Sequence, residues 1–326
     1  MNHNRIGLLL WPFQRMQLLR FLLLLALACA VDHTHAQTKP TAQIAPYART
    51  EDVVYGRKFG TALTLDVFQP TGTKPNGFAI IQVISGGWVS SHANISPAGL
   101  QTYLDRGYTV FAVVHGSQPK FTLPEIVPDL HRAVRFIRHN AARWAIDPAH
   151  LGITGSSAGG HLSLTLGTQG GPGPADAKDP IDRASSAVQA VACFYPPTDF
   201  LNYGREGEIA VGRGILKDYI PAFGPDALTP EGRQKLGQTF SPTRYVTATA
   251  APTLIIHGDA DPLVPIQQSQ LYVARATAAG ATARLIVKPG AEHGGKTWPD
   301  LAGDRRRFAD WFDHYLRGLP LAASNH

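Results

Sequence analysis

The chain has 326 residues, of which 44% are hydrophobic and 17% charged, so it is too apolar to be disordered and can form one large α/β domain or two small ones. Its formal net charge of +6 is spread without a dense Lys/Arg run, which argues against nucleic acid as a partner. The 32 Gly and 25 Pro favour many tight turns over a helical bundle.

The first 36 residues have the features of a secretory signal peptide. Arg15 and Arg20 precede an apolar run at 21–30, and small residues follow it. The run is too short to span a bilayer, so an integral membrane protein is the lesser alternative. We therefore expect residues 1–36 to be removed and the protein to be secreted or periplasmic.

Cleavage is predicted after Ala36, with Ala30 as the alternative site, and Met16 is an alternative start of translation. Residues 26–29 resemble a lipoprotein box that lacks the usual Leu, so lipidation of Cys29 is a minor alternative. The leader carries three arginines and one aspartate, so its removal lowers the net charge from +6 to +4. The mature protein would keep a single thiol at Cys193, which leaves no internal disulfide and no cysteine-based metal site.

Downstream of the leader, residues 37–50 are predicted to be a polar linker, and residues 53–57 and 62–68 a hairpin that turns at 59–61. Apolar strand segments then alternate with helical patterns, the clearest of which follows Pro124. This alternation is typical of a mostly parallel, twisted sheet with helices on both faces. The remaining strand candidates are 78–84, 109–114, 151–154, 187–194, 253–257 and 283–287.

One segment, residues 200–245, interrupts this alternation and is rich in Gly, Tyr, Arg and Pro. An insertion of that length between two strands is typically a lid or a decorated loop. We predict a lid-like cap.

A candidate nucleophile follows the strand at 151–154. The sequence Gly-Ser-Ser-Ala-Gly at 155–159 comes directly after this strand, and a helical pattern follows. This strand–turn–helix context is what G-x-S-x-G needs to act as a nucleophile elbow. A serine on such a strained turn needs glycine neighbours, and the helix N-terminus places N–H groups beside the reacting oxygen. Ser157 is therefore the candidate, whereas Ser156 lies one position off the motif.

A serine hydroxyl needs a base that takes its proton and an acid that orients this base. In this architecture the acid and then the histidine follow the serine along the chain. Asp259 and Asp261 follow the strand at 253–257, and spacing alone does not separate them. His293, in a glycine-rich loop after the strand that ends near residue 287, is the candidate base. The weaker alternatives are His257, His161 and His115 as the base and Glu292 as the acid.

Hydrolysis also needs hydrogen-bond donors for the developing oxyanion. Residues 82–88 read Gln-Val-Ile-Ser-Gly-Gly-Trp after a predicted strand. The N–H groups of Gly86, Gly87 and Ala158 are predicted to form the oxyanion hole. The alternative is an ordinary glycine turn buried under Trp88.

These motifs together resemble the α/β-hydrolase superfamily. The segments 155–162 and 255–265 and the loop of His293 are similar to its bacterial esterase branch, which includes feruloyl and acetyl-xylan esterase-like enzymes and lies near hormone-sensitive-lipase-like esterases and kynurenine formamidases. The resemblance implies an α/β-hydrolase domain at 51–318, a C-terminal tail at 319–326, and no metal or organic cofactor.

The resemblance also bears on single residues. In that family the Asp before x-x-Val-Pro is the triad acid, which implies Asp261. The family's oxyanion loop commonly reads His-Gly-Gly-Gly-Trp, whereas this chain has Ile84 and Ser85 before its two glycines. The hydrogen bonds that support the loop must therefore differ from those of the family.

The implied activity is a serine hydrolase that cleaves carboxylic esters through Ser157, Asp261 and His293 and an acyl-enzyme intermediate. Amide cleavage, as in an arylformamidase or an exopeptidase, is the alternative, because the same triad serves both reactions. A non-catalytic binding protein on this fold is a minor alternative, and no triad residue is lost here.

We expect small or aromatic acyl esters, including saccharide-linked ones, in preference to long-chain lipids. The predicted location and the resemblance favour such substrates. In the insertion, Tyr203, Tyr219 and Phe223 stand among charged residues, unlike the apolar flap that a lipid surface demands. Trp88 can offer a stacking face to an aromatic group. These four residues are the candidate substrate-binding residues, unless they pack the insertion onto the sheet.

Overall fold

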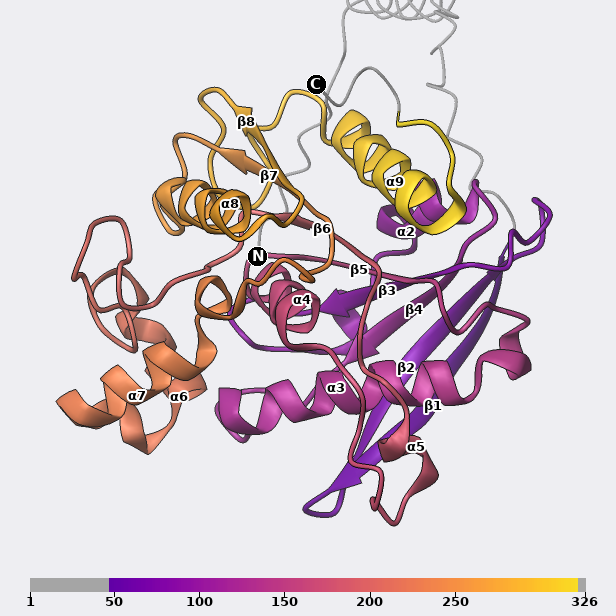
Figure 1. Cartoon of the computed structure of the whole chain (residues 1–326), viewed down its shortest axis with the longest axis horizontal. Helices are drawn as coiled ribbons and strands as arrows, with labels where there is room; N and C mark the ends of the chain where they lie inside the picture. Colours follow the sequence, from indigo (N-terminus) through magenta and orange to yellow (C-terminus); the bar gives the residue numbers. More distant parts are fainter. Residues whose placement is uncertain (1–46, 322–326) are drawn as a thin grey trace, which may run out of the picture. The chain divides into compact units, whose positions relative to one another are not determined.

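The computed structural model describes residues 47–321, which form an eight-stranded sheet with helices on both faces (Figure 1). The strand order is β1-β2-β4-β3-β5-β6-β7-β8; β1–β2 and β2–β4 are antiparallel and the other pairs are parallel. This arrangement confirms the predicted α/β-hydrolase architecture. The strands are β1 (Tyr47–Lys58), β2 (Thr61–Pro70), β3 (Ala79–Ile84), β4 (Thr109–Val114), β5 (Leu151–Ser156), β6 (Ala190–Phe194), β7 (Thr253–Gly258) and β8 (Ala283–Lys288).

The N-terminal hairpin turns at Phe59 and Gly60, as predicted, with φ angles of 46° and 73°. Two successive positive φ angles match the turn to the twist of the paired strands. The first strand begins earlier than predicted, because residues 47–50 pair with 67–70 and are not linker. A polar contact explains the difference: the Arg49 guanidinium donates to the buried carboxylate of Asp66, with Nε 2.9 Å from Oδ2.

Residues 1–46 and 322–326 lie outside the described residues, and with them the predicted signal peptide, its cleavage sites and the lipidation site at Cys29. Among the described residues, no helix combines the length and the apolar composition needed to cross a bilayer.

Helices cover the sheet on two sides. Figure 1 shows α2 and α9 on one face and α3 and α4 on the other. Each face has its own apolar core, with Phe308 and Phe312 of α9 in one and Ile126, Leu130 and Leu162 in the other. The helices that contact the strands are α2 (Pro97–Leu104), α3 (Leu123–His139), α4 (Ala158–Gln169), α8 (Gln267–Ala279) and α9 (Leu301–Arg317); short turns of helix are η1 (His92–Asn94), η2 (Ala141–Trp144) and α5 (Pro180–Arg183).

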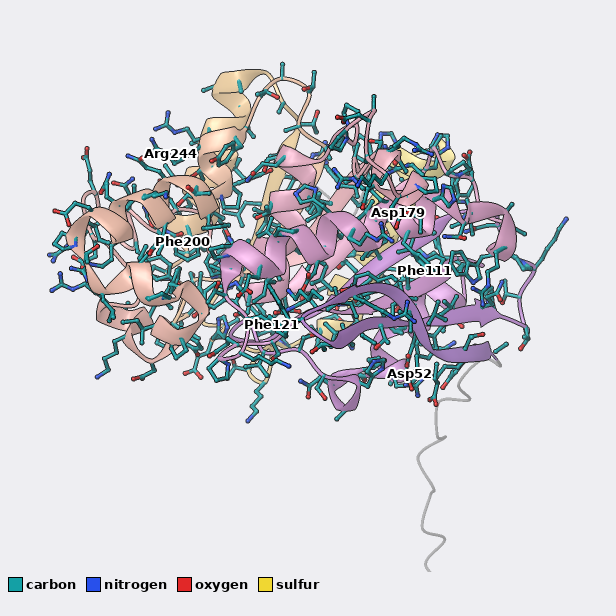
Figure 2. The ribbon with its side chains drawn as sticks, turned by 90° about the horizontal axis from the view of Figure 1, so that it is seen from below. Asp52, Phe111, Phe121, Asp179, Phe200 and Arg244 are labelled. Atoms are coloured by element: carbon teal, nitrogen blue, oxygen red, sulfur yellow. The ribbon has the colours of Figure 1, made fainter. Side chains whose placement is uncertain are left out.

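The predicted insertion at 200–245 is a packed lobe between β6 and β7. Its side chains Phe200 and Phe223 are buried and belong to the same core as α3 and α4. Figure 2 shows Phe200 and Arg244 within this lobe, away from Phe111 of β4. Its elements are η3 (Gly214–Tyr219), α6 (Ile220–Phe223), η4 (Pro225–Leu228), α7 (Pro230–Phe240) and η5 (Pro242–Tyr245).

Candidate active site

Ser157 occupies the turn between β5 and α4. Its backbone has φ 53° and ψ −121°, a conformation that L-residues rarely adopt. The turn is this tight because its glycines leave no room for side chains: a Cβ on Gly155 would lie 2.4 Å from the carbonyl oxygen of Gly159. The Ser157 N–H donates to the Phe194 carbonyl at the end of β6, which fixes the turn on the sheet. The predicted elbow geometry is therefore present.

Two further loops bring a histidine and a carboxylate to this serine. His293, between β8 and α9, has Nε2 3.0 Å from Ser157 Oγ and Nδ1 2.6 Å from Asp261 Oδ2. With Nδ1–H donating to the carboxylate, Nε2 is left to accept the serine proton. The His293 side chain is 18% exposed and that of Asp261 is fully buried, so the base faces the solvent side and the acid lies behind it.

The Asp261 carboxylate is held by four groups. Its Oδ1 accepts from the N–H groups of Leu263 and Val264, and its Oδ2 also lies 3.3 Å from His257 Nε2. Burial on its own would raise the pKa of Asp261, but the hydrogen bonds from His257, His293 and Val264 outweigh it and hold the pKa well below its usual range. The carboxylate is therefore ionised at neutral pH and suited to orient His293.

The structure separates the two aspartates that spacing left open. Asp259 is exposed, and its Oδ1 accepts from the N–H of Gly290 at 2.6 Å, which anchors the start of the His293 loop. Of the two aspartates, only Asp261 has its carboxylate within hydrogen-bond distance of the His293 imidazole. Gly258 keeps the two loops in contact, since a Cβ there would lie 2.1 Å from the carbonyl oxygen of Ala291.

The weaker candidates have other partners. His257 is buried between the Ser269 hydroxyl and the Val264 carbonyl, and so supports the acid. The Ser156 hydroxyl faces the Tyr195 hydroxyl. Glu292 is exposed, and its backbone N–H donates to the Thr297 hydroxyl while its carbonyl accepts from the Trp298 indole. His161 donates from Nε2 to the Phe240 carbonyl.

The oxyanion prediction needs one correction. The Gly86 N–H donates to the Val89 carbonyl at 3.0 Å, in a short β-bridge, and cannot serve the oxyanion. Gly87 and Ala158 make no such backbone contact in the described part of the chain, so their N–H groups are the donors that remain. The bridge could not be foreseen, because its partner lies beyond the motif.

The departure from the family loop has a structural counterpart. The Ser85 hydroxyl lies 2.9 Å from Nε2 of His115, whose Nδ1 donates to the Gly116 carbonyl. Burial lowers the pKa of His115 to about 4, so the ring is neutral and accepts from Ser85. The Ser85 side chain thus joins the start of the loop to the residues after β4.

The predicted substrate-binding role is wrong for three of the four candidate residues. Trp88, Tyr203 and Phe223 are at most 2% exposed and pack the insertion onto the sheet, so they offer no face to a substrate. The Trp88 indole N–H donates to His161 Nδ1 at 3.2 Å, and the Tyr203 hydroxyl donates to the Leu263 carbonyl. Tyr219 is partly exposed and abuts the oxyanion loop, because a Cβ on Gly87 would lie 2.6 Å from its ring. It remains a candidate.

Sequence reasoning missed Tyr195, directly after β6. Its ring packs on that of His293 with centroids 4.5 Å apart, and its φ is +36°, unusual for a tyrosine. The available signal was its place at the end of a parallel strand adjacent to the nucleophile's strand, where sites of open α/β sheets gather.

One group of side chains could in principle hold a metal ion. Asp52, Asp66 and His92 place ligand atoms within 4.8 Å of one another. However, Arg49 already engages Asp66, and the Thr64 hydroxyl lies 2.7 Å from His92 Nε2. This cluster ties the first hairpin to the residues after β3 and fits a charge network better than a metal site.

The sheet order, the serine turn and the Ser–His–Asp geometry define an α/β-hydrolase. The BD-FAE family model matches residues 65–275, and the chain belongs to this esterase family. It is 29% identical over 255 residues to esterase LipQ of Mycobacterium tuberculosis, covering 76% of this chain and 57% of that protein. It is 28% identical to the probable carboxylic ester hydrolase LipM of the same organism, and this match covers 70% of this chain and 51% of that protein. The chain thus spans little more than half of each relative.

Solved structures give the same class. A truncated form of a carbohydrate esterase from gut microbiota is similar with a TM-score of 0.70 and 26% identity, over 85% of this chain and 99% of that chain. An acetyl ester-xyloside bifunctional hydrolase from Caldicellulosiruptor lactoaceticus shares the fold, with a TM-score of 0.62 and 22% identity. The match covers 82% of this chain and 94% of that chain.

Proposed function

We propose that this protein is a secreted serine carboxylesterase that hydrolyses small or aromatic acyl esters. The observation that carries the proposal is the hydrogen-bonded chain from Ser157 Oγ through both nitrogens of His293 to Asp261. Membership of an esterase family supports ester hydrolysis over amide cleavage.

In the proposed cycle, Ser157 Oγ attacks the ester carbonyl carbon while its proton passes to His293 Nε2. The carbonyl oxygen becomes an oxyanion beside the N–H groups of Gly87 and Ala158. The bond to the alcohol then breaks, and His293 returns the proton to the departing oxygen. Water attacks the acyl-enzyme by the same route, which releases the acid and restores Ser157. Asp261 keeps the imidazole in the required tautomer throughout.

The substrate class rests on three supports. The sequence before residue 37 has the features of a leader, which would send the enzyme to extracellular esters. The similar structures include proteins named as a carbohydrate esterase and an acetyl ester-xyloside hydrolase. Tyr219, beside the oxyanion loop, offers an aromatic edge to a bound acyl group.

A fluorophosphonate probe tests the nucleophile. We expect one label on Ser157, located by peptide mass spectrometry, and no label in Ser157→Ala. This variant should keep the circular dichroism spectrum and lose turnover by roughly 10⁶-fold, as for removal of other triad serines. Labelling that persists in the variant, for example on Ser156, would overturn the assignment.

A substrate panel tests the reaction. We expect kcat/KM for p-nitrophenyl esters to fall from acetate to palmitate, with methyl ferulate hydrolysed and a matched acetanilide much slower. A rise toward long chains, activation by a lipid surface, or faster cleavage of the anilide would contradict the proposal.

The location is tested separately. Expression with the native N-terminus should yield a protein outside the cytoplasm whose first residue is Gln37. A cytoplasmic protein that retains residues 1–36 would contradict secretion and leave the esterase assignment intact.

A further inference from the structure

A cavity of about 170 Å³ lies where β3, β5 and β6 end, between α2 and α9. Three of its lining residues are neighbours of the candidate site: Ser156 precedes the nucleophile, Gly294 follows the base, and Tyr195 packs on the ring of His293. A cavity of this size has room for a small polar group. The cavity therefore adjoins the residues that flank the nucleophile and the base.

Polar and apolar side chains share the lining of this cavity, which carries one positive charge. Arg305 of α9 is its single ionised side chain, and no carboxylate lines it. Around Arg305 stand the hydroxyl groups of Tyr103, Thr154 and Tyr195. Burial raises the pKa of Tyr103 to about 12, against the opposing effects of its hydrogen bond with Thr154 and of the charge of Arg305, so the phenol is protonated at neutral pH.

Arg305 also differs from neighbouring arginines. On the same helix, Arg306 lies 3.8 Å from Asp300 and Arg307 lies 2.9 Å from Asp304. Arg106, which follows the end of α2, forms a salt bridge with Asp310 at 2.7 Å. Within residues 47–321, no salt bridge joins Arg305 to a carboxylate. Arg305 is half-buried, and a guanidinium beside hydroxyl groups is complementary to an anion.

We infer that this cavity is a subsite for a carboxylate on the alcohol part of the ester, bound by Arg305 as an ion pair. The inference rests on the proposed function. The alcohol side is assigned from the reaction. The departing oxygen must receive its proton from His293 Nε2, and two neighbours of His293, Gly294 and Tyr195, line the cavity. The substrates that fit are acyl esters of hydroxy acids, such as uronic-acid sugars or hydroxybenzoates.

Matched aryl acetates test the subsite. The substrates 4-carboxyphenyl acetate and 4-carbamoylphenyl acetate share the acyl group and differ in the charge of the alcohol part. We expect Arg305→Gln to lower kcat/KM for the carboxylate by about tenfold or more, the effect of losing one charge-assisted hydrogen bond pair, and to leave the neutral ester within about twofold. Arg306→Gln, on the same helix with a 60% exposed side chain, is the control and should change neither.

A binding measurement separates this inference from the proposed function. In calorimetry, wild type should bind 4-hydroxybenzoate about tenfold more tightly than 4-hydroxybenzamide, and Arg305→Gln should lose this preference. If neither acetate is cleaved but the preference is present and depends on Arg305, the esterase assignment fails and the subsite stands. If wild type shows no preference for the carboxylate, or Arg305→Gln retains it, the subsite is refuted.

Discussion

Gly86 and Gly87 form a matched pair that tests the corrected oxyanion hole. Gly87 has φ +55°, and a Cβ there would lie 2.6 Å from the ring of Tyr219. Gly86 has no such φ, and a Cβ there would have no atom within 4 Å. Alanine at 87 therefore meets backbone strain and a clash, whereas alanine at 86 meets neither.

The expected magnitudes follow from this geometry. Holding alanine in the left-handed region costs roughly 1–3 kcal/mol of stability. Displacing one oxyanion donor costs about 10²–10³ in kcat. Gly86→Ala should stay within about 0.5 kcal/mol of wild type, because its Cβ would meet no atom within 4 Å and its N–H would keep the Val89 carbonyl as partner.

The assay compares kcat for p-nitrophenyl acetate with the free energy of unfolding in urea for both variants. A third variant, Tyr219→Ala in the Gly87→Ala background, removes the clash, and its stability should be higher than additivity predicts. The reasoning is refuted if Gly86→Ala loses as much activity as Gly87→Ala, since the strain and the clash at position 87 would then not explain the loss.

The remaining predictions concern the acid, the loop contact and the pH dependence of stability. Asp261→Asn should lower kcat by about 10⁴ by stabilising the wrong imidazole tautomer, whereas Asp259→Asn should cost far less, as steady-state kinetics will show. Gly258→Ala should reduce both kcat and the melting temperature, because its Cβ would meet the backbone of Ala291 at 2.1 Å; an unchanged kcat would contradict this. Burial lowers the pKa of His161 to about 4 in the folded protein. Between about pH 6.5 and 4, the unfolded chain therefore binds a proton at His161 that the folded protein does not bind. As the pH falls through this range, His161 should lower the free energy of unfolding by up to ~3 kcal/mol. When the free energy of unfolding in urea is measured at several pH values, its decrease with falling pH should be smaller in His161→Gln than in the wild type.

The elements and the nucleophile could be predicted because they depend on local pattern. The alternation of strand and helix patterns requires only neighbouring residues, and the elbow combines glycines, strand and helix within a dozen positions. The choice between Asp259 and Asp261 could not be derived from spacing, since both follow β7 within three residues. It depends on which carboxylate the loop after β7 turns inward to meet His293, a contact between segments 32 residues apart.

The two corrections have a common physical origin. An N–H group serves the oxyanion only if no carbonyl takes it first, and the carbonyl that takes the Gly86 N–H belongs to Val89, outside the glycine motif. An aromatic residue in an insertion contacts substrate only if the insertion does not fold onto the sheet. Tyr203 and Phe223 are covered because the lobe packs against the core of α3 and α4, which residue type and neighbouring charge do not reveal.

The lobe at 200–245 is connected to the oxyanion loop by a short chain of contacts. The carbonyl of Phe240, at the end of α7, accepts from His161 Nε2, and His161 Nδ1 accepts from the Trp88 indole. Trp88 directly follows Gly87, and both residues have positive φ, 60° and 55°. Because His161 is neutral and fully buried, one ring nitrogen donates and the other accepts. The hydrogen bonds are therefore donated from Trp88 to His161 and from His161 to Phe240. The insertion therefore supports the strained loop at Trp88, which directly follows Gly87, the residue whose N–H is the proposed oxyanion donor.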